Sequence, residues 1–261
     1  MTQELRLYET GTKQHSLYEE MYKTQTYQHV INKLKQYYFL NNAKLTMIEA
    51  LCMLDDYIDP SDPDLDLPNS IHAYQTAERI RKEHPKNVEY QVAGLIHDVG
   101  KILFKYGEPS YNVVGDTYVV GAKFPETMVY YTTLKDNNPD YYDKRYNTKL
   151  GVYKENCGLD KLKLSFGHDE YLYHVLTRNT NHLFPYKLSR VIRYHSFYPW
   201  HSFNEYQHFM KNEDYNLLKD VQNFNKYDLY SKEDTSFKLT EGIKKYYDKL
   251  LQHFFPEPLR W

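Results

Sequence analysis

A histidine and an aspartate within the most apolar stretch of the chain constrain its fold more than any other feature. Residues 92–104 are largely apolar but are interrupted by His97, Asp98 and Lys101. Apolar side chains recur there at helical spacing, at Val92, Ile96, Val99 and Leu103, which predicts a buried helix. A carboxylate on such a helix costs free energy unless a positive group compensates for it. We therefore expect Asp98 to lie beside a cation, either Lys101 alone or Lys101 together with a metal ion.

Helical periodicity recurs through most of the remaining sequence, whereas alternation of polar and apolar residues is scarce. The sequence therefore predicts a mainly α fold. Helices are expected at residues 16–38, 46–57, from a cap at Asn69 or Ser70 to just before Pro85, and at 88–106, 159–180, 186–195, 213–227 and 239–255. Residues 108–156 show no clear period, and 111–120 could form a short hairpin or part of a long ordered loop. No repeat or change in composition marks a boundary, so residues 1–261 are expected to form a single domain.

Charge and cysteine content argue against several classes of function. The 261 residues carry 33 Lys plus Arg and 35 Asp plus Glu, a net charge of -2, which argues against a nucleic-acid partner. Two cysteines, Cys52 and Cys157, are too few for a disulfide framework or a thiolate zinc site and fit a reducing compartment. We find no apolar run typical of a membrane span or a secretion signal. We therefore expect a cytoplasmic protein without a membrane partner, and the lack of an apolar excess favours a monomer.

Further histidines and aspartates interrupt helical patterns elsewhere. Taken singly, each has an ordinary interpretation: His97, for example, could be a core histidine bonded to a carbonyl, with Asp98 and Lys101 as an ion pair. The candidate metal ligands are His72, His97, Asp98, His168, His195 and Asp228. Together they form a nitrogen and oxygen donor set that iron, manganese or zinc accepts. Six ligands exceed what one ion with an open position needs, so we expect two ions bridged by Asp98. Zinc would suit hydrolysis, and iron would suit oxygen chemistry.

The order of His72, His97-Asp98 and Asp228 resembles the ligand order of the HD-domain superfamily of metal-dependent phosphohydrolases. Longer strings resemble the myo-inositol oxygenase family, and this resemblance runs from about Arg6 to Trp261. The strings are Asp62-Pro-Asp-Leu-Asp-Leu-Pro-Asn-Ser-Ile-His72, Gly94-Leu-Ile-His-Asp-Val-Gly-Lys101, Gly107-Glu-Pro, Val114-Gly-Asp-Thr117, Gly151, Cys157-Gly-Leu-Asp160, Gly167-His-Asp-Glu-Tyr171, His195-Ser-Phe-Tyr-Pro-Trp-His201 and Phe224-Asn-Lys-Tyr-Asp-Leu-Tyr230.

This resemblance implies a helical HD-domain-like bundle that encloses a dinuclear iron site. One iron would be held by His72, His97, Asp98 and Asp228, and the second by His168 and His195, with Asp98 bridging the two. The family works in the mixed Fe(II)/Fe(III) state. With O2 it cleaves the C1–C6 ring bond of myo-inositol and forms D-glucuronate and water.

The family's substrate contacts fall on residues that are spread along the chain. They are Arg6, Asp59, Ser61, Lys101, Gly115, Asp116, Ser196 and Lys232. A neutral polyol needs hydroxyl donors and acceptors instead of a basic funnel, which agrees with the near-zero net charge. We expect Lys101 and Asp98 to act in catalysis. Lys101 would donate to a coordinated hydroxyl or relay a proton, with its pKa lowered by desolvation. We place His201 outside the ligand set, in a supporting role.

Two alternatives to an inositol oxygenase remain open at the level of the sequence. A phosphohydrolase of the same superfamily would need no O2, but it would want a basic phosphate pocket, for which Lys101 and Lys232 alone are thin evidence. A metal-bound regulatory module without catalysis is the second alternative. The complete ligand set and Lys101 argue against it.

Overall fold

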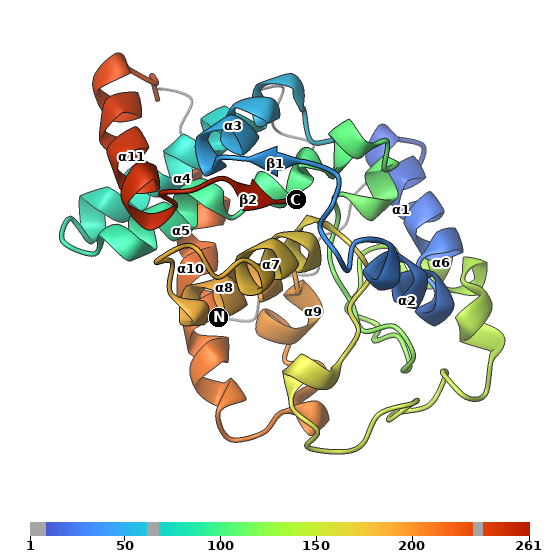
Figure 1. Ribbon diagram of the computed structural model, residues 1–261. Helices are drawn as coiled ribbons and strands as arrows, with labels where there is room; N and C mark the ends of the chain where they lie inside the picture. Colours follow the sequence, from blue (N-terminus) through green and yellow to red (C-terminus); the bar gives the residue numbers. More distant parts are fainter. Residues whose placement is uncertain (1–8, 62–67, 232–236) are drawn as a thin grey trace.

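The structure is a computed structural model and describes residues 9–61, 68–231 and 237–261 (Figure 1). It is mainly helical, as predicted. The α-helices are α1 (Lys13–Thr24), α2 (Tyr27–Gln36), α3 (Met47–Cys52), α4 (Asn69–Glu83), α5 (Val88–Ile96), α6 (Tyr131–Leu134), α7 (His168–Arg178), α8 (Tyr186–Tyr194), α9 (Tyr198–His201), α10 (Asp214–Ser231) and α11 (Glu241–Phe254). The 3-10 helices are η1 (Met53–Asp56), η2 (Val99–Tyr106), η3 (Ser110–Asn112), η4 (Lys135–Asn137), η5 (Pro139–Tyr142), η6 (Leu159–Lys161) and η7 (Gln207–Phe209).

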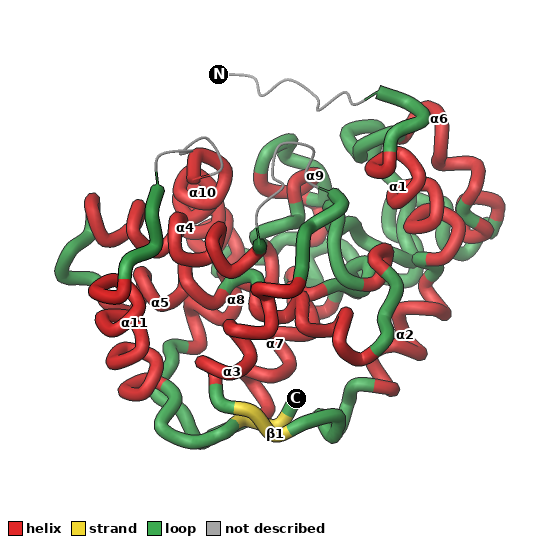
Figure 2. The backbone as a smooth tube through the Cα atoms, turned by 90° about the horizontal axis from the view of Figure 1, so that it is seen from above, coloured by secondary structure: helices red, strands yellow, loops and turns green. Residues whose placement is uncertain are grey.

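Helices α4, α5, α7, α8 and α10 form the central bundle. Helices α4 and α5 approach closely at Gly94, where an added Cβ would lie 2.7 Å from Cδ1 of Ile80. Both Gly94 and Ile80 are buried, so the contact is part of the core. Figure 2 shows α1, α2 and α6 at one end of the molecule and α11 at the other.

The predicted helix over 88–106 is wrong at its centre. Helix α5 ends at Ile96 and η2 begins at Val99, so His97 and Asp98 lie at the junction. Nδ1 of His97 donates to the carbonyl oxygen of Gly94 at 2.7 Å, and this oxygen is the one that the Asp98 amide would use in a continuing α-helix. The backbone instead tightens, with the Lys101 amide bonded to the Asp98 carbonyl at 2.9 Å.

The predicted helix over 16–38 is two helices, because α1 ends at Thr24 and α2 begins at Tyr27. Thr26 caps α2 by accepting from the His29 amide at 3.2 Å. The break also turns the Gln25 side chain inward, where it donates to the carbonyl of Phe166 at 2.8 Å. Residues 46–57 likewise form α3 followed by η1.

The predicted continuous helix over 159–180 is wrong in its first half, because the α-helix there begins only at His168. Only η6 and α7 are helical there, and the segment between them runs beside residues 118–120 through an isolated bridge between Val119 and Leu164. Residues 111–120 are therefore not a hairpin but part of a long ordered connection. The predicted cap of α4 at Asn69 or Ser70 is wrong, because both residues lie inside the helix, which starts at Asn69. Pro68 occupies the N-cap position and forms no side-chain hydrogen bond there.

A small two-stranded sheet joins the C-terminal segment to residues 44–45. Strand β1 (Lys44–Leu45) pairs antiparallel with β2 (Leu259–Arg260), with Leu45 opposite Leu259 (Figure 1). The last residue, Trp261, is fully buried, and its indole N–H donates to the Leu45 carbonyl at 3.2 Å. In the described ranges we find no helix with both the length and the apolar character that crossing a bilayer requires.

Candidate metal centre

The six candidate ligands come from five places in the central bundle and are all buried. His72 is in the first turns of α4, His97 and Asp98 occupy the α5–η2 junction, and His168 begins α7. His195 directly follows α8, and Asp228 lies near the end of α10. The close approach of η2 to α7 depends on Gly100, where a Cβ would lie 2.1 Å from the His168 carbonyl oxygen. The fold therefore brings together residues up to 156 positions apart.

The first group of donors surrounds Oδ2 of Asp98. Nε2 of His72 lies 2.9 Å from Oδ1 of Asp228 and 3.9 Å from Oδ2 of Asp98. Nε2 of His97 lies 3.4 Å from Oδ1 of Asp228 and 3.5 Å from Oδ2 of Asp98. These separations are compatible with donors that share one cation.

The second group surrounds the other oxygen of Asp98. Oδ1 of Asp98 lies 3.2 Å from Nε2 of His168 and 3.7 Å from Nε2 of His195. The two imidazole Nε2 atoms are 3.4 Å apart. Each carboxylate oxygen of Asp98 thus faces its own pair of histidines, which is the arrangement that a bridging carboxylate needs.

Backbone carbonyls fix the tautomer of three of the histidines. Nδ1 of His97, His168 and His195 lies 2.7 Å from the carbonyl oxygen of Gly94, Val113 and Ile192, respectively. Because a carbonyl oxygen can only accept, each Nδ1 carries a proton, and each ring turns Nε2, the nitrogen left for a metal ion, toward Asp98. Nε2 of His97 is buried and has no hydrogen-bond partner within the described ranges. A metal ion fits this unsatisfied acceptor and the donor set around it.

The electrostatics of the centre favour ionised carboxylates. Burial raises the pKa of the Asp98 carboxyl, but Lys101 and His97 outweigh burial and hold the pKa well below its ordinary value. Burial lowers the pKa of His168, but Asp169 and Asp98 outweigh it and raise the pKa to about 9. The His168 imidazole is therefore protonated at neutral pH in the absence of a metal ion, so metal binding and protonation of His168 compete.

The expectation of a lowered pKa for Lys101 is wrong. Nζ of Lys101 donates to Oδ2 of Asp98 and to Oδ2 of Asp59, each at 2.7 Å. Burial acts to lower the pKa of the ammonium, but the two carboxylates outweigh burial and raise the pKa well above its ordinary value. Lys101 is therefore a charged donor, and in this arrangement it is no base.

The other described candidate substrate contacts fall into two groups, of which the one with Asp59 adjoins this ammonium. Ser61 donates its hydroxyl to Oδ1 of Asp59 at 2.7 Å, so these two residues form one turn beside Lys101. Ser196 follows His195, and its carbonyl accepts from the Thr117 amide at 2.9 Å, which joins it to Gly115 and Asp116. Arg6 and Lys232 lie outside the described residues.

Helix α1 contacts both of these substrate segments, although no feature of its sequence predicts this role. Nε2 of Gln14 donates to the Ser61 carbonyl at 2.5 Å, and the Tyr18 hydroxyl donates to Oδ1 of Asp116 at 3.1 Å. Gln14 and Tyr18 are one helical turn apart on the buried face of α1. Their spacing is visible in the sequence, but their partners are distant in it. His201 supports the ligands through a contact of 2.9 Å between its Nε2 and the His195 carbonyl.

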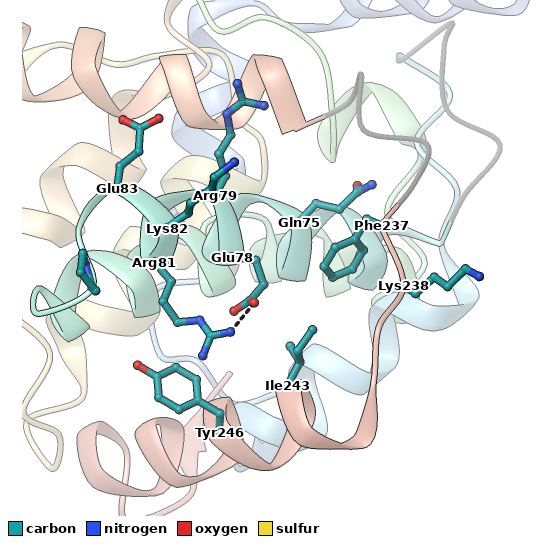
Figure 3. A pocket seen from close by; sticks show the side chains of 11 residues that line it. Gln75, Glu78, Arg79, Arg81, Lys82, Glu83, Phe237, Lys238, Ile243 and Tyr246 are labelled. Atoms are coloured by element: carbon teal, nitrogen blue, oxygen red, sulfur yellow. Dashed lines mark hydrogen bonds and ion pairs between the residues drawn. The ribbon is translucent and has the colours of Figure 1, made fainter.

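A cavity of about 870 Å³ lies away from the six ligands, between α4 and the segment that enters α11 (Figure 3). Charged side chains of α4 line it, among them Glu78 and Arg81, which form an ion pair of 2.5 Å. Phe237 and Ile243 form its apolar wall. None of the six candidate ligands lines this cavity.

Comparison with known proteins gives full-length similarity to one family. The family model described as Myo-inositol oxygenase matches residues 12–261. Inositol oxygenase of Danio rerio is 42% identical, over 99% of this chain and 93% of its own length. Inositol oxygenase of Mus musculus is 43% identical over 94% of this chain and 85% of its own length. A protein named probable inositol oxygenase in Oryza sativa subsp. japonica is 43% identical over 98% of this chain and 84% of its own length.

Proposed function

Since this chain belongs to the myo-inositol oxygenase family, we propose that it cleaves the C1–C6 ring bond of myo-inositol with O2 and forms D-glucuronate and water. The observation that carries the proposal is Asp98, whose two oxygens face two separate groups of donors. The reaction balances, because one inositol and one O2 supply all atoms of glucuronate and one water. The chain is thus proposed to be a ring-cleaving oxidoreductase of inositol catabolism.

We assign two iron ions per chain to the two groups of donors. His72, His97, Asp228 and Oδ2 of Asp98 would hold the first, and His168, His195 and Oδ1 of Asp98 would hold the second. The nitrogen and carboxylate donors suit iron. When bound, the iron pair, in its mixed Fe(II)/Fe(III) state, supplies the activation of O2 and binds the substrate hydroxyls. The first group has four protein donors and the second has three, which leaves the second position more open to substrate.

Lys101 is the residue that the chain itself offers to a reacting hydroxyl. Its ammonium carries three N–H donors, and the contacts with Asp98 and Asp59 use two of them. The third can donate to a hydroxyl oxygen of inositol and favour loss of that hydroxyl's proton. Asp98 fixes the position of the ammonium at 2.7 Å.

The remaining substrate contacts are assigned to side chains that match hydroxyl groups. Asp59 and Asp116 can accept from ring hydroxyls, while Ser61 and Ser196 can accept or donate. The backbone at Gly115 would add a further contact, and Arg6 and Lys232 would contribute cationic donors. A mixed set of this kind suits a neutral polyol.

We also propose that the enzyme works as a cytoplasmic monomer. Both cysteines are free thiols, and Cys52 is exposed, which fits a reducing compartment. The net charge of -2 gives no reason to expect an anionic macromolecule as a partner.

The test is O2 uptake by purified, iron-reconstituted protein with and without myo-inositol, together with metal analysis and detection of glucuronate. We expect about two irons per chain and uptake that depends on inositol. His168→Ala and His195→Ala should each lower the iron content and abolish turnover. Two bound metals without O2 uptake, together with hydrolysis of a phosphate ester, would overturn the proposal in favour of a phosphohydrolase.

A further inference from the structure

Asp169 places a second carboxylate, in addition to Asp98, at the histidine pair of the second donor group. It is the second residue of α7 and is 1% exposed. Its Oδ1 lies 2.8 Å from Nδ1 of His195 and 3.0 Å from Nε2 of His168. The Ser196 hydroxyl donates to the same oxygen at 3.2 Å. One buried oxygen therefore contacts both candidate ligands and a candidate substrate contact.

The charge of Asp169 is not balanced by a lysine or arginine in the described part of the chain, where its ion-pair contacts are the two histidines. Its other oxygen, Oδ2, is buried without a hydrogen-bond partner among the described residues. The adjacent Glu170 differs, because it is paired with Arg193 at 2.7 Å. A buried carboxylate with these partners depends on a cation in its surroundings, which is a protonated imidazole in the metal-free protein or a bound metal ion.

The two donor groups also differ in their own carboxylates. His72 and His97 have Asp228 and share Asp98, whereas His168 and His195 have only their share of Asp98. Asp169 supplies the second negative charge beside His168 and His195. Asp169 lies behind the His195 ring, at Nδ1, and a carboxylate in that place fixes the ring and raises its basicity. At His168 it contacts Nε2, the nitrogen that faces the metal position, so there it adds negative charge to the donor group.

We propose that Asp169 is a positioning residue that orients His195 and places, beside the metal-facing nitrogen of His168, the charge that lets the second donor group bind a divalent cation. This inference rests on the two-metal assignment made above. Through Ser196 it also couples the second metal position to a substrate contact.

The test titrates Mn²⁺ into metal-free protein by calorimetry, in wild type and in Asp169→Asn. The wild type should bind two ions. The variant should bind the first ion as the wild type does and the second about 10- to 100-fold more weakly. The paramagnetic resonance spectrum provides a second readout, since two neighbouring Mn²⁺ ions couple whereas a single ion does not.

Asp214→Asn is the matched control. Asp214 is fully buried, and it begins α10, fourteen residues or about 21 Å along the helix from Asp228. This control removes a buried carboxylate of the same size and should leave both affinities unchanged. Asp169→Glu, which keeps the charge, should weaken the second site less than Asp169→Asn does, and it serves as the test if Asp169→Asn does not fold.

Three results would overturn the inference: unchanged affinities in Asp169→Asn, an equal loss at both positions, or a wild type that binds a single ion. Glucuronate formation by the wild type is measured separately. A wild type that binds two ions, with a selective loss in Asp169→Asn but no turnover of inositol, would support the role of Asp169 and overturn the proposed function. The two failures are therefore distinguishable.

Discussion

Lys101 and Lys105 lie on the same 3-10 helix, and each contacts a carboxylate at 2.7 Å, but their surroundings differ. The Lys101 contact with Asp98 is buried, and its contact with Asp59 is largely buried, between side chains that are 6% and 12% exposed. The contact of Lys105 with Asp56 is at the surface, with side chains that are 36% and 68% exposed. A buried ion pair that loses one partner leaves an uncompensated charge, whereas an exposed pair is solvated and screened.

Replacement of Lys101 by methionine should therefore lower the free energy of unfolding of metal-free protein by about 3–5 kcal/mol. Lys105→Met should change it by less than about 1 kcal/mol. Denaturant titration of the two variants beside the wild type makes the comparison. Equal losses in both would contradict the difference in environment described above.

Glu108 gives a dependence of stability on pH. Its carboxylate accepts from Nζ of Lys33 at 2.8 Å, the Tyr37 hydroxyl at 2.6 Å and Nδ2 of Asn112 at 2.8 Å. Burial acts to raise the pKa of Glu108, but these donors outweigh burial and lower it. A carboxyl with a lowered pKa in the folded state stabilises the protein above its unfolded pKa, and this contribution is lost as the pH falls through the folded pKa.

Glu108→Gln should thus be less stable than the wild type by about 1–3 kcal/mol at neutral pH. The gap should begin to narrow as the pH falls below about 4.3, because the carboxyl of the unfolded wild-type chain then takes up a proton, and it should close as the pH falls through the lower pKa of the folded state. Denaturant titrations at pH 7, 5 and 3.5 measure the gap. A gap that is the same at all three values would show that the charge of Glu108 has no part in it.

At the scale of helices, the sequence predicts which segments are helical better than it predicts where they break. The breaks at Gln25 and His97 depend on side chains that bond to backbone carbonyls, Gln25 to Phe166 and His97 to Gly94. Helical periodicity continues through both positions, because it records the buried face and is silent about these bonds. Residues 108–156 show no clear period for the same reason, since contacts with distant helices order them, such as those of Tyr22 with Val129 and of Tyr27 with Asp140.

In the candidate metal centre, too, the sequence predicts which residues take part better than it predicts their contacts. The six candidate ligands are recognisable in the sequence, and the structure brings them together. Asp169 follows His168 in the same motif, yet its importance depends on His195, 26 positions later, at 2.8 Å. Opposite charges on Lys101 and Asp98 suggest contact, but the raised pKa of Lys101 depends also on Asp59, which comes from the loop after η1.

The close packing of η2 on α7, next to the junction that carries Asp98, predicts the effect of a substitution at Gly100. Gly100→Ala would place a methyl group 2.1 Å from the His168 carbonyl oxygen, so η2 and α7 would have to separate. We expect a loss of about 1–3 kcal/mol in the free energy of unfolding. We also expect weaker metal binding, since Asp98 and His168 would move apart.

Gly242→Ala in α11 is the control for this substitution. An added Cβ there has its nearest neighbour at 3.8 Å, and alanine favours a helix, so this variant should be unchanged or more stable by up to about 1 kcal/mol. Thermal unfolding and Mn²⁺ titration compare the two. A Gly100→Ala protein that matches Gly242→Ala in both would contradict the close packing of η2 on α7.

At the scale of the whole molecule, the candidate ligands connect α4, the α5–η2 junction, α7, α8 and α10. A metal ion bound by several helices stabilises the folded state, because the unfolded chain does not hold these donors together. A free concentration one hundred times the dissociation constant contributes about 2.7 kcal/mol per site. We still predict that residues 1–261 form one domain. If they do, the helices around the metal centre unfold together, in a single thermal transition, when the bound ions are lost.

Chelation should therefore lower the midpoint of thermal unfolding while leaving one cooperative transition, and added Fe²⁺ or Mn²⁺ should restore the midpoint. His195→Ala should retain only the part of the shift that belongs to the first donor group, because His72, His97 and Asp228 are intact in that variant. Calorimetric scans with and without chelator measure both effects. A midpoint that ignores the chelator would mean that the donors bind no ion in the folded state. Two separate transitions would mean that the helices around the centre do not unfold as one unit.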